Sequence, residues 1–519
     1  MKKKILLLIV LVTNTLFSQN LTVSTNTSLT VKNSSNLFIS GNMTNNGTIT
    51  LNSDSNSYSS LIINGTATGN VNYKRTVNAY TDNSNNDDND LVSAPVSGQT
   101  FGAFSSNSDN NNLLASGTLR AFAPFDKSAG TYVNYDTSSN NNTVITAGTG
   151  YRAATTDGGT LTFTGSVETG TVAVNIEDSG SSYADWNLVG NPYPSYVDLS
   201  VFLNHEVSSG ITNLDILEGA SGVYGYDGDV SDGWDIITLA NVGSRLLAPG
   251  QGFFVAADAE DVSAYDLEFT PAMRTSGSSD DFIAGRSSDD ELTFFNLNLS
   301  AANKSYNTEF YFNDNATSGL DSGYDAVLWG ADTSGFMIYS HLAQENTGIP
   351  IALQALGNYD LVDIRIPLGV NANSSDQLTI SITEFNLPNN ITVYLEDSYE
   401  NTVTFLNSDD YVFTPDTDLL GTGRFFLSFT ENSLSIEENT LSTINIFSES
   451  ITKRIVINGI LDKPTNAKIY DMQGRMVNSQ DLNSNSTSQY MDVNYLSSGV
   501  YVVRLTNTIQ ALSKKIIIH

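Results

Sequence analysis

The chain has 519 residues, too long for one ordinary domain of about 150 residues, and only 15% of its residues are charged, so Asn, Ser, Thr, Asp and Gly supply much of its polarity. Its 56 acidic and 23 basic residues give a net charge of −33, a negative field that repels nucleic acids and excludes DNA and RNA as partners. The sequence holds no cysteine, which excludes disulfides, thiolate metal sites and cysteine nucleophiles together.

The first residues have the pattern of a secretory signal peptide. Three lysines at positions 2–4 precede an apolar run at 5–12, and polar and small residues follow. This run is too short to span a membrane as a helix, and we predict cleavage between Ser18 and Gln19. No later segment approaches 18 uninterrupted apolar residues, so we expect no spanning helix in the mature chain.

Residues 19–72 are predicted to form very short strands at regular spacing. Alternating pieces such as "LTV" at 29–31 and "TITL" at 48–51 are separated by Asn-Gly and Ser-Asn pairs, which favour turns. Either a few turns of a β-solenoid or an irregular meander would produce this pattern. The many Asn-x-Ser/Thr triplets are interpreted as turn and strand composition.

The middle of the chain contains an apparent duplication. "DLVSAPVSGQTFGAF" resembles "NLVGNPYPSYVDLSVF", with Pro95 standing 97 residues before Pro192, and further matching segments follow in the same order. We therefore predict two related β-modules at residues 73–175 and 176–275.

Each predicted module contains a Gly-x-Gly sequence before an aromatic strand, at residues 148–150 and 250–252. We expect these glycines to permit a tight bend that leads Tyr151 and Phe253 into the interior. A third glycine and a following helix, which a nucleotide-binding loop requires, are absent from the pattern, so a phosphate-binding role is disfavoured.

Residues 276–291 fall in hydrophobic content and are predicted to be a linker. Strand patterning resumes at "LTFFNLNLS", and alternating apolar residues between Gly, Pro, Asn and Asp turns predict an antiparallel β-sandwich over 292–431.

The best metal candidate is the segment "YDGDVSDGWD". It holds four aspartates within nine positions, and calcium prefers six to eight oxygen ligands. The spacing is not that of an EF-hand, and the matching segment of the first module, 126–130, has no such cluster, which favours a plain acidic turn. No cofactor is therefore certain, and calcium remains the one candidate, with the ligands Asp227, Asp229, Asp232 and Asp235. The segment "DNSNNDDND" at 82–90 is likewise interpreted either as a plain acidic loop, which is favoured, or as a calcium site.

No catalytic constellation is recognisable. The three histidines are His205, His341 and His519, and none stands in a zinc-peptidase motif. Carboxylate pairs for glycoside hydrolysis depend on separation in space. The tryptophans Trp186, Trp234 and Trp329 would stack on sugars if exposed, but core packing is the favoured interpretation for Trp186 and Trp234. We expect a protein that is not an enzyme.

The final residues carry three motifs in order: "AKIYDMQGRMV", "LSSGVYVVRLT" and "SKKIIIH". They resemble the type A C-terminal sorting domain of type IX secretion systems in Bacteroidota, over residues 432–519. The Asn-Pro box that often opens such domains is replaced here by "INIFSESITKRIVING". The matching residues, taken as the sorting signal, are Tyr470, Asp471, Gly474, Arg475, Gly499, Tyr501, Arg504, Lys514 and Lys515.

The resemblance implies export through the periplasm, removal of the sorting domain by the type IX machinery, and release or attachment to surface lipopolysaccharide. Segments such as "WNLVGNPYP" and "PGQGFFV" also resemble uncharacterised β-rich modules of such cargo. We therefore expect an all-β modular protein: a short β-solenoid-like segment, two related β-modules, an antiparallel β-sandwich and a small C-terminal β-sandwich sorting domain. The leading function is an adhesin-like or structural component that binds a glycan or surface polymer, and the alternative is a hydrolase or accessory carbohydrate-binding protein acting on polysaccharide.

Overall fold

The computed structural model confirms the all-β prediction. In the described part of the chain, the α-helices are the single turns α1 (Phe101–Ser105) and α2 (Leu199–Leu203), and nearly all other regular structure is strand. No helix there is long and apolar enough to span a membrane. The structure describes residues 15–80, 89–180, 183–226, 234–262, 264–277, 292–331, 333–358, 364–388, 391–431, 444–449, 453–459, 461, 464–483, 486–507 and 511–518.

The first strands form three parallel sheets, each of which takes one short strand from every turn of the chain. This is the arrangement of a β-solenoid, the first of the two alternatives that the sequence left open. One residue in two points inward, so that Ile39, Leu51 and Ile63 are fully buried. The sheets consist of β1 (Thr15–Ser18), β4 (Asn36–Ile39) and β9 (Ser60–Ile63); β2 (Leu21–Val23), β5 (Met43–Asn45) and β10 (Ala67–Thr68); and β3 (Ser28–Val31), β6 (Thr48–Leu51) and β11 (Val71–Thr76).

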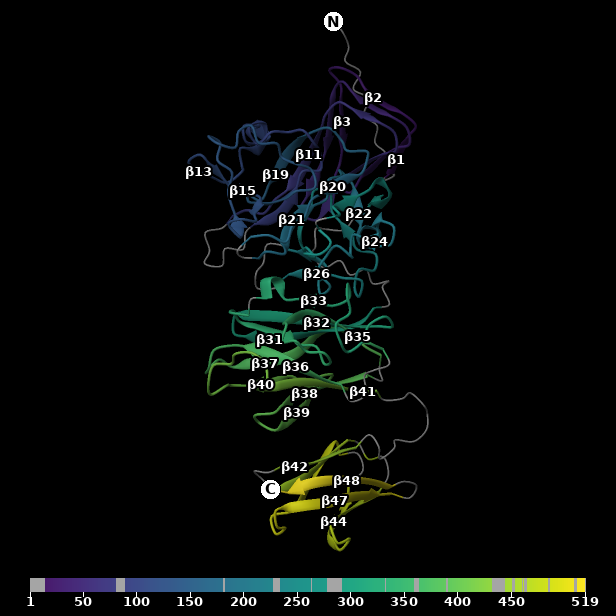
Figure 1. The fold of residues 1–519 in the computed structure, drawn as a ribbon, viewed down its shortest axis with the longest axis vertical. Helices are drawn as coiled ribbons and strands as arrows, with labels where there is room; N and C mark the ends of the chain where they lie inside the picture. The colour runs from purple at the N-terminus through teal and green to yellow at the C-terminus, as the bar shows by residue number, and fades with distance from the viewer. Residues whose placement is uncertain are drawn as a thin grey trace.

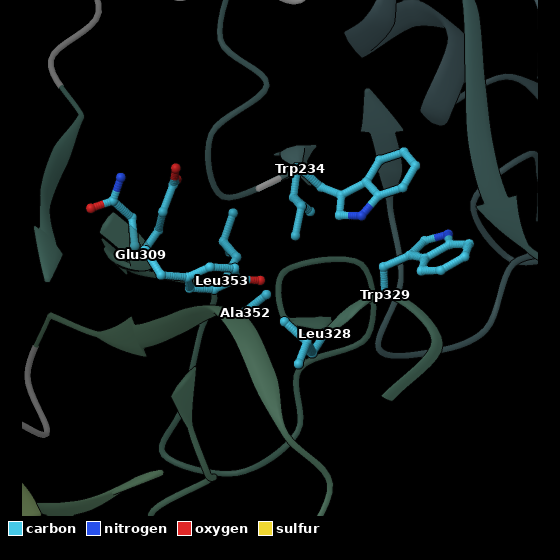
Figure 2. Close-up of a pocket in the computed structure, with 9 residues that line it drawn as sticks. Trp234, Glu309, Leu328, Trp329, Ala352 and Leu353 are labelled. Carbon is cyan, nitrogen blue, oxygen red and sulfur yellow. The ribbon is translucent and has the colours of Figure 1, made fainter. Parts of the chain in front are cut away.

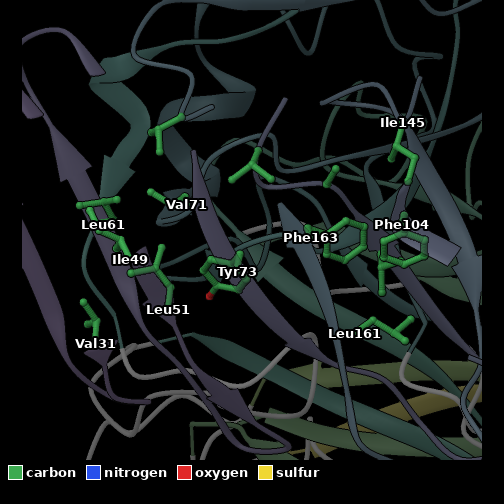
Figure 3. Close-up of a cluster of buried hydrophobic side chains, with 14 of the residues drawn as sticks. Val31, Ile49, Leu51, Leu61, Val71, Tyr73, Phe104, Ile145, Leu161 and Phe163 are labelled. Atoms are coloured by element: carbon green, nitrogen blue, oxygen red, sulfur yellow. The ribbon is translucent and has the colours of Figure 1, made fainter. Parts of the chain in front are cut away.

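The strand β11 joins the solenoid to the next module. It pairs in parallel with β6 on one side and antiparallel with β19 (Thr160–Gly165) on the other. The predicted boundary between residues 72 and 73 falls inside this strand. One continuous hydrophobic cluster therefore extends from Val31 and Leu61 in the solenoid to Phe104 and Phe163 in the module (Figure 3).

The two predicted modules hold corresponding elements in the same order. In each, a first strand is followed by a single-turn helix, a central strand, and a strand that pairs antiparallel with the first. The first module contains β12 (Asp90–Ser93), α1, β15 (Phe122–Ala123), β16 (Phe125–Asp126), β17 (Thr131–Tyr132) and β18 (Gly150–Ala153). The second contains β21 (Trp186–Gly190), α2, β25 (Val223–Gly225), β26 (Asp235–Ile237) and β28 (Gly252–Ala256).

Smaller elements complete these modules. β20 (Val172–Val174) lies before the predicted boundary at residue 175 but pairs with β29 (Leu267–Phe269) of the second module. The others in the modules are η1 (Ser108–Asn110), β13 (Ala115–Ser116), β14 (Leu119–Arg120), β22 (Tyr196–Asp198), β23 (Glu206–Ser208), β24 (Ile211–Thr212), β27 (Leu246–Leu247), η2 (Pro271–Met273) and β30 (Arg274–Thr275). The solenoid also contains the short hairpin of β7 (Ser53–Asp54) and β8 (Ser57–Tyr58).

The modules meet through a reciprocal contact. Val92 of β12 forms a bridge with Gln251, and Val189 of β21 forms a bridge with Thr149. Each bridge therefore joins the first strand of one module to the Gly-x-Gly sequence of the other, as in a contact around a two-fold axis. Gly148 and Gly250 adopt positive φ angles of 85° and 66°, as the predicted bends require.

Beyond these bends, Tyr151 and Phe253 are buried, which confirms the direction predicted for them.

The next part is one sheet folded on itself into a sandwich. Its two halves are joined where Ser340 of β34 pairs with Ile351 of β35, and its pairs are antiparallel except for β32 with β35. The inward residues Phe295, Leu368 and Val393 are fully or almost fully buried. The strands are β31 (Thr293–Ala301), β32 (Lys304–Asn313), β33 (Ala326–Val327), β34 (Met337–Ser340), β35 (Ile351–Gly357), β36 (Arg365–Asn371), β37 (Leu378–Asn386), β38 (Ile391–Asp397), β39 (Thr402–Phe405), β40 (Tyr411–Phe413) and β41 (Phe425–Glu431), with η3 (Trp329–Ala331).

The last domain is a small sandwich of two sheets, ordered β42-β43-β46 and β45-β44-β47-β48. Its core between the sheets includes the fully buried Ile455, Ile469 and Val503. The strands are β42 (Asn445–Glu449), β43 (Arg454–Asn458), β44 (Thr465–Asp471), β45 (Met476–Leu482), β46 (Ser488–Asp492), β47 (Gly499–Thr506) and β48 (Ala511–Ile518). Figure 1 shows the parts along the long axis, with the modules above the sandwich and the C-terminal domain at the far end.

Candidate functional site

The best-defined motif is the turn that joins β44 to β45. The Asp471 carboxylate accepts hydrogen bonds from the backbone amide of Arg475 at 3.0 Å and from its Nε at 3.1 Å. These bonds, the backbone one foremost, lower the pKa of Asp471. Gly474 has a φ of 79°, a conformation that favours glycine. The motif residues Asp471, Gly474 and Arg475 therefore build one charged turn.

The second motif lies in β47, beside this turn. Asp471 is opposite Tyr501 in the ladder, and the Tyr501 hydroxyl donates to the carbonyl of Ser497 at 2.8 Å. Gly499 is the first residue of β47 and follows the turn at 494–498.

The last motif forms β48, an edge strand of its sheet. Lys514 and Lys515 are both exposed, whereas Ile516 and Ile518 are buried in the core. The two lysines point to opposite faces because successive side chains alternate along a strand. The Lys514 Nζ donates to Asn445 Oδ1 of β42 at 2.9 Å. Tyr470 and Arg504 lie on the other face, as Lys515 does.

The acidic calcium candidate is described only at its end. The Asp235 carboxylate accepts from the Arg245 Nη1 at 2.9 and 3.1 Å, so a cation side chain already occupies it. Asp227, Asp229 and Asp232 lie outside the described residues, as do residues 82–88 of the other acidic segment. Within the described ranges, no group of three His, Cys, Asp or Glu residues is placed to hold a metal ion.

The histidines occupy separate environments. His205 Nε2 lies 3.0 Å from Glu268 Oε2 in a partly exposed pair. His341 packs beside Tyr339, with ring centroids 5.7 Å apart, and partial burial lowers its pKa. His519 lies outside the described residues.

The three tryptophans gather where the second module meets the sandwich. Trp186 is 2% exposed, and Trp329 stacks on Trp234 and on Tyr183 with centroid distances of 5.2 and 4.7 Å. The ring faces are used within the protein, which favours the core-packing interpretation over stacking on sugars.

A cavity of about 50 Å³ lies beside this aromatic cluster (Figure 2). It has room for a few water molecules but not for a sugar ring. Glu309 is the single carboxylate among the residues that line it. A glycosidase requires two carboxyl groups at the scissile bond, and this cavity does not bring two together.

A more open groove of about 490 Å³ lies on the first module, against α1. Its lining is polar, with Arg120 as the charged member and no carboxylate. Sequence reasoning missed it because the residues come from three separate segments, and no spacing within one segment marks them. They are Thr100, Gly102, Ala103, Ser105, Ser106, Arg120, Thr137, Asn141 and Asn142.

A buried carboxylate fixes the loop between β32 and β33 of the sandwich, which contacts the second module. Asp325 is fully buried and accepts from the backbone amides of Asp321 and Ala355 at 2.7 and 2.8 Å. Burial raises its pKa to about 7. The same loop donates from the Gly323 amide to the Gly219 carbonyl of the second module at 3.0 Å.

Comparisons with known proteins divide the chain into two matched parts. Residues 7–429 match the family described as "Domain of unknown function (DUF8693)", and residues 434–519 match the "Secretion system C-terminal sorting domain". No curated protein matches. Among solved structures, a "Biofilm associated protein - BSP domain" is 15% identical over 27% of this chain and 27% of its own, with a TM-score of 0.16. The predicted C-terminal sorting domain is thereby confirmed.

Proposed function

We propose that residues 19–431 are a non-enzymatic binding or structural protein delivered outside the cell. The chain belongs to the family of the Domain of unknown function (DUF8693), and it carries the sorting domain of a type IX secretion cargo. The sorting domain indicates export, followed by secretion or attachment at the cell surface. Removal of the signal peptide after Ser18 and of the sorting domain is part of the proposal. After removal, lipopolysaccharide is the proposed anchor.

The observation that carries the proposal is the polar groove on the first module. Hydroxyl and amide groups line it, and these are the groups that hydrogen-bond to the hydroxyls of a neutral glycan. Arg120 at the same groove suits a carboxylate on an acidic sugar. We therefore propose an adhesin-like protein that recognises a glycan or other surface polymer.

The sheets behind the groove support this function because they hold it on a rigid frame. The Arg75 Nη2 donates to Gln251 Oε1 at 2.6 Å, a bond that joins the strand β11 to the second module. The Leu61 amide donates to the Pro194 carbonyl at 2.6 Å, which joins the solenoid to the same module. Lys127 donates to the carbonyl of Trp186 at 2.7 Å and couples the first module to the second.

The test is a binding screen of the secreted product against immobilised glycans and lipopolysaccharide, with and without calcium. We expect Arg120→Ala to weaken binding by about tenfold, the loss of one charge-assisted hydrogen bond. Arg365→Ala is the matched control, because Arg365 is an exposed arginine of the sandwich, paired with Glu396.

Equal losses in both variants would show that the groove is not the binding site. Binding to none of the polymers would favour a pure spacer, and release of sugar from a polysaccharide would favour the hydrolase alternative.

A further inference from the structure

The sorting domain differs in charge from the rest of the chain. Residues 434–519, the matched sorting domain, contain eight basic and seven acidic residues, a net charge of +1. The preceding 433 residues contain 15 basic and 49 acidic residues, a net charge of −34. A general need for acidity in a secreted protein therefore does not account for the composition of this domain.

Its basic residues are placed on one face of a sheet. In an antiparallel ladder, residues directly opposite each other share a face. Lys468 of β44 is opposite Arg504 of β47, and Val502 of β47 is opposite Lys515 of β48. Because Tyr501 and Val503 are buried in the core, the residues that alternate with them point outward.

Apolar side chains lie between these cations on the same outer face. Tyr470 is opposite Val502, and Val500 is opposite Ile517, which is 53% exposed. Lys515 and Arg504 are exposed as well. We call this set the basic face: Lys468, Tyr470, Val500, Val502, Arg504, Lys515 and Ile517.

Among the described residues, the carboxylate of Asp481 lies on this side of the sheet, at its end, and is hydrogen-bonded. Asp481 of β45 accepts a hydrogen bond from Asn466 at 2.7 Å, one row beyond Lys468 and Arg504. The basic face thus presents three cations around apolar groups that are partly exposed, and at Ile517 exposed, the composition of a docking surface with a charged rim.

From this placement we infer that the basic face docks onto an acidic, partly apolar protein surface of the export machinery. The inference rests on the sorting domain and is independent of the glycan-binding function proposed for the cargo. The inference assigns different roles to the two adjacent lysines of the last motif. Lys515 contacts the partner, whereas Lys514, bonded to Asn445, holds β48 against β42.

A protein partner fits the face better than an anionic membrane does. Each basic residue near such a membrane strengthens binding by only about fivefold, so three give roughly a hundredfold, and stable lipid-binding segments use clusters of about four to eight. Three cations fixed on a sheet between apolar groups instead suit electrostatic steering and registration of a protein partner.

The test is export of the full-length chain in a bacterium that carries a type IX secretion system. Lys468→Glu and Lys515→Glu place a carboxylate opposite the inferred acidic surface. We expect each to reduce the amount of exported cargo by about tenfold or more, with unprocessed chain retained in the periplasm. Protease resistance of the purified variants checks that the domain is folded.

Lys453→Glu is the matched control, because Lys453 is an exposed residue before β43 and changes the net charge equally away from the basic face. Export of the face variants at the wild-type level, or an equal loss in Lys453→Glu, would overturn the inference.

A second arm measures flotation of the purified chain with phosphatidylcholine–phosphatidylglycerol vesicles. If Lys515→Glu loses vesicle binding while its export is unchanged, the partner is a lipid and the inference is wrong. If vesicles bind neither form and export falls, the protein partner is supported.

Discussion

The reciprocal contact between the two modules leaves no room for a side chain at the second glycine of each Gly-x-Gly. A Cβ on Gly150 would lie 2.5 Å from the Val189 carbonyl oxygen and 2.6 Å from the Leu188 Cγ. A Cβ on Gly252 would lie 2.8 Å from the Val92 amide nitrogen. Two of these three atoms belong to the backbone of the opposing module, so the strain is relieved only if the modules move apart.

The expected cost follows from this geometry. Overpacking a core costs about 1–3 kcal/mol, and a clash with backbone belongs at the upper end of that range. Replacing Gly by Ala also lowers the entropy of the unfolded chain, which returns about 0.4–1 kcal/mol. We therefore expect Gly150→Ala to lower the free energy of unfolding by about 2 kcal/mol.

The assay is urea unfolding followed by tryptophan fluorescence, since Trp186 lies in β21, the strand that the new methyl group would contact. With a slope of about 2 kcal/mol per molar urea, the midpoint should fall by about 1 M. Gly170→Ala is the matched control. Among the described residues, nothing lies within 4 Å of the position that its Cβ would take.

We expect the midpoint of Gly170→Ala to stay the same or to rise slightly. If Gly150→Ala and Gly170→Ala have equal midpoints, the contact between the modules is not what requires glycine at position 150, and the reasoning is refuted.

Three further predictions concern the sandwich and the processing of the chain. Arg424 donates to the buried Asp397 carboxylate at 2.7 Å, so Arg424→Met leaves that carboxylate without its cation. We expect the free energy of unfolding, measured in urea, to fall by about 3–5 kcal/mol. An unchanged free energy of unfolding would contradict the assigned ion pair. The pKa of Asp325 is raised to about 7, so between a pH of about 4 and about 7 the folded state holds a proton that the unfolded state has lost, and the free energy of unfolding should fall as the pH rises through this range. In urea unfolding measured across that range, Asp325→Asn should remove this dependence on pH. A dependence that persists in the variant would show that another group causes it. Mass spectrometry of the exported product should give Gln19 as its first residue and a C-terminus before the sorting domain; a product that retains either end would contradict the processing.

The sequence predicted features whose determinants are contiguous. Asp471, Gly474 and Arg475 form their turn through bonds within five residues, so the motif itself carries the geometry. In the same way, alternation in "TITL" at 48–51 fixes which residues of β6 face the core. Such local patterns were sufficient to predict the all-β class and the sorting domain.

Features that depend on long-range contacts were not predicted. β11 belongs to two sheets at once, and its residues give no sign that β19, almost ninety residues later, will pair with it. The parallel pairing of β32 with β35 has the same origin. Arg120 reaches the polar groove only because α1 and residues 137–142 fold beside it. The burial of Asp325 likewise became visible only in the structure.

The paired lysines of β48 show that a sequence motif does not by itself reveal which of its side chains is available to a partner. Lys514 and Lys515 are equivalent in composition, yet the period of two along β48 assigns one to the side of Asn445 and the other to the basic face. A shift of the ladder by one residue would exchange their positions and would also expose Ile516 and Ile518 to solvent. Ile516 and Ile518 therefore fix the register, and through the register they decide which lysine is presented to a partner.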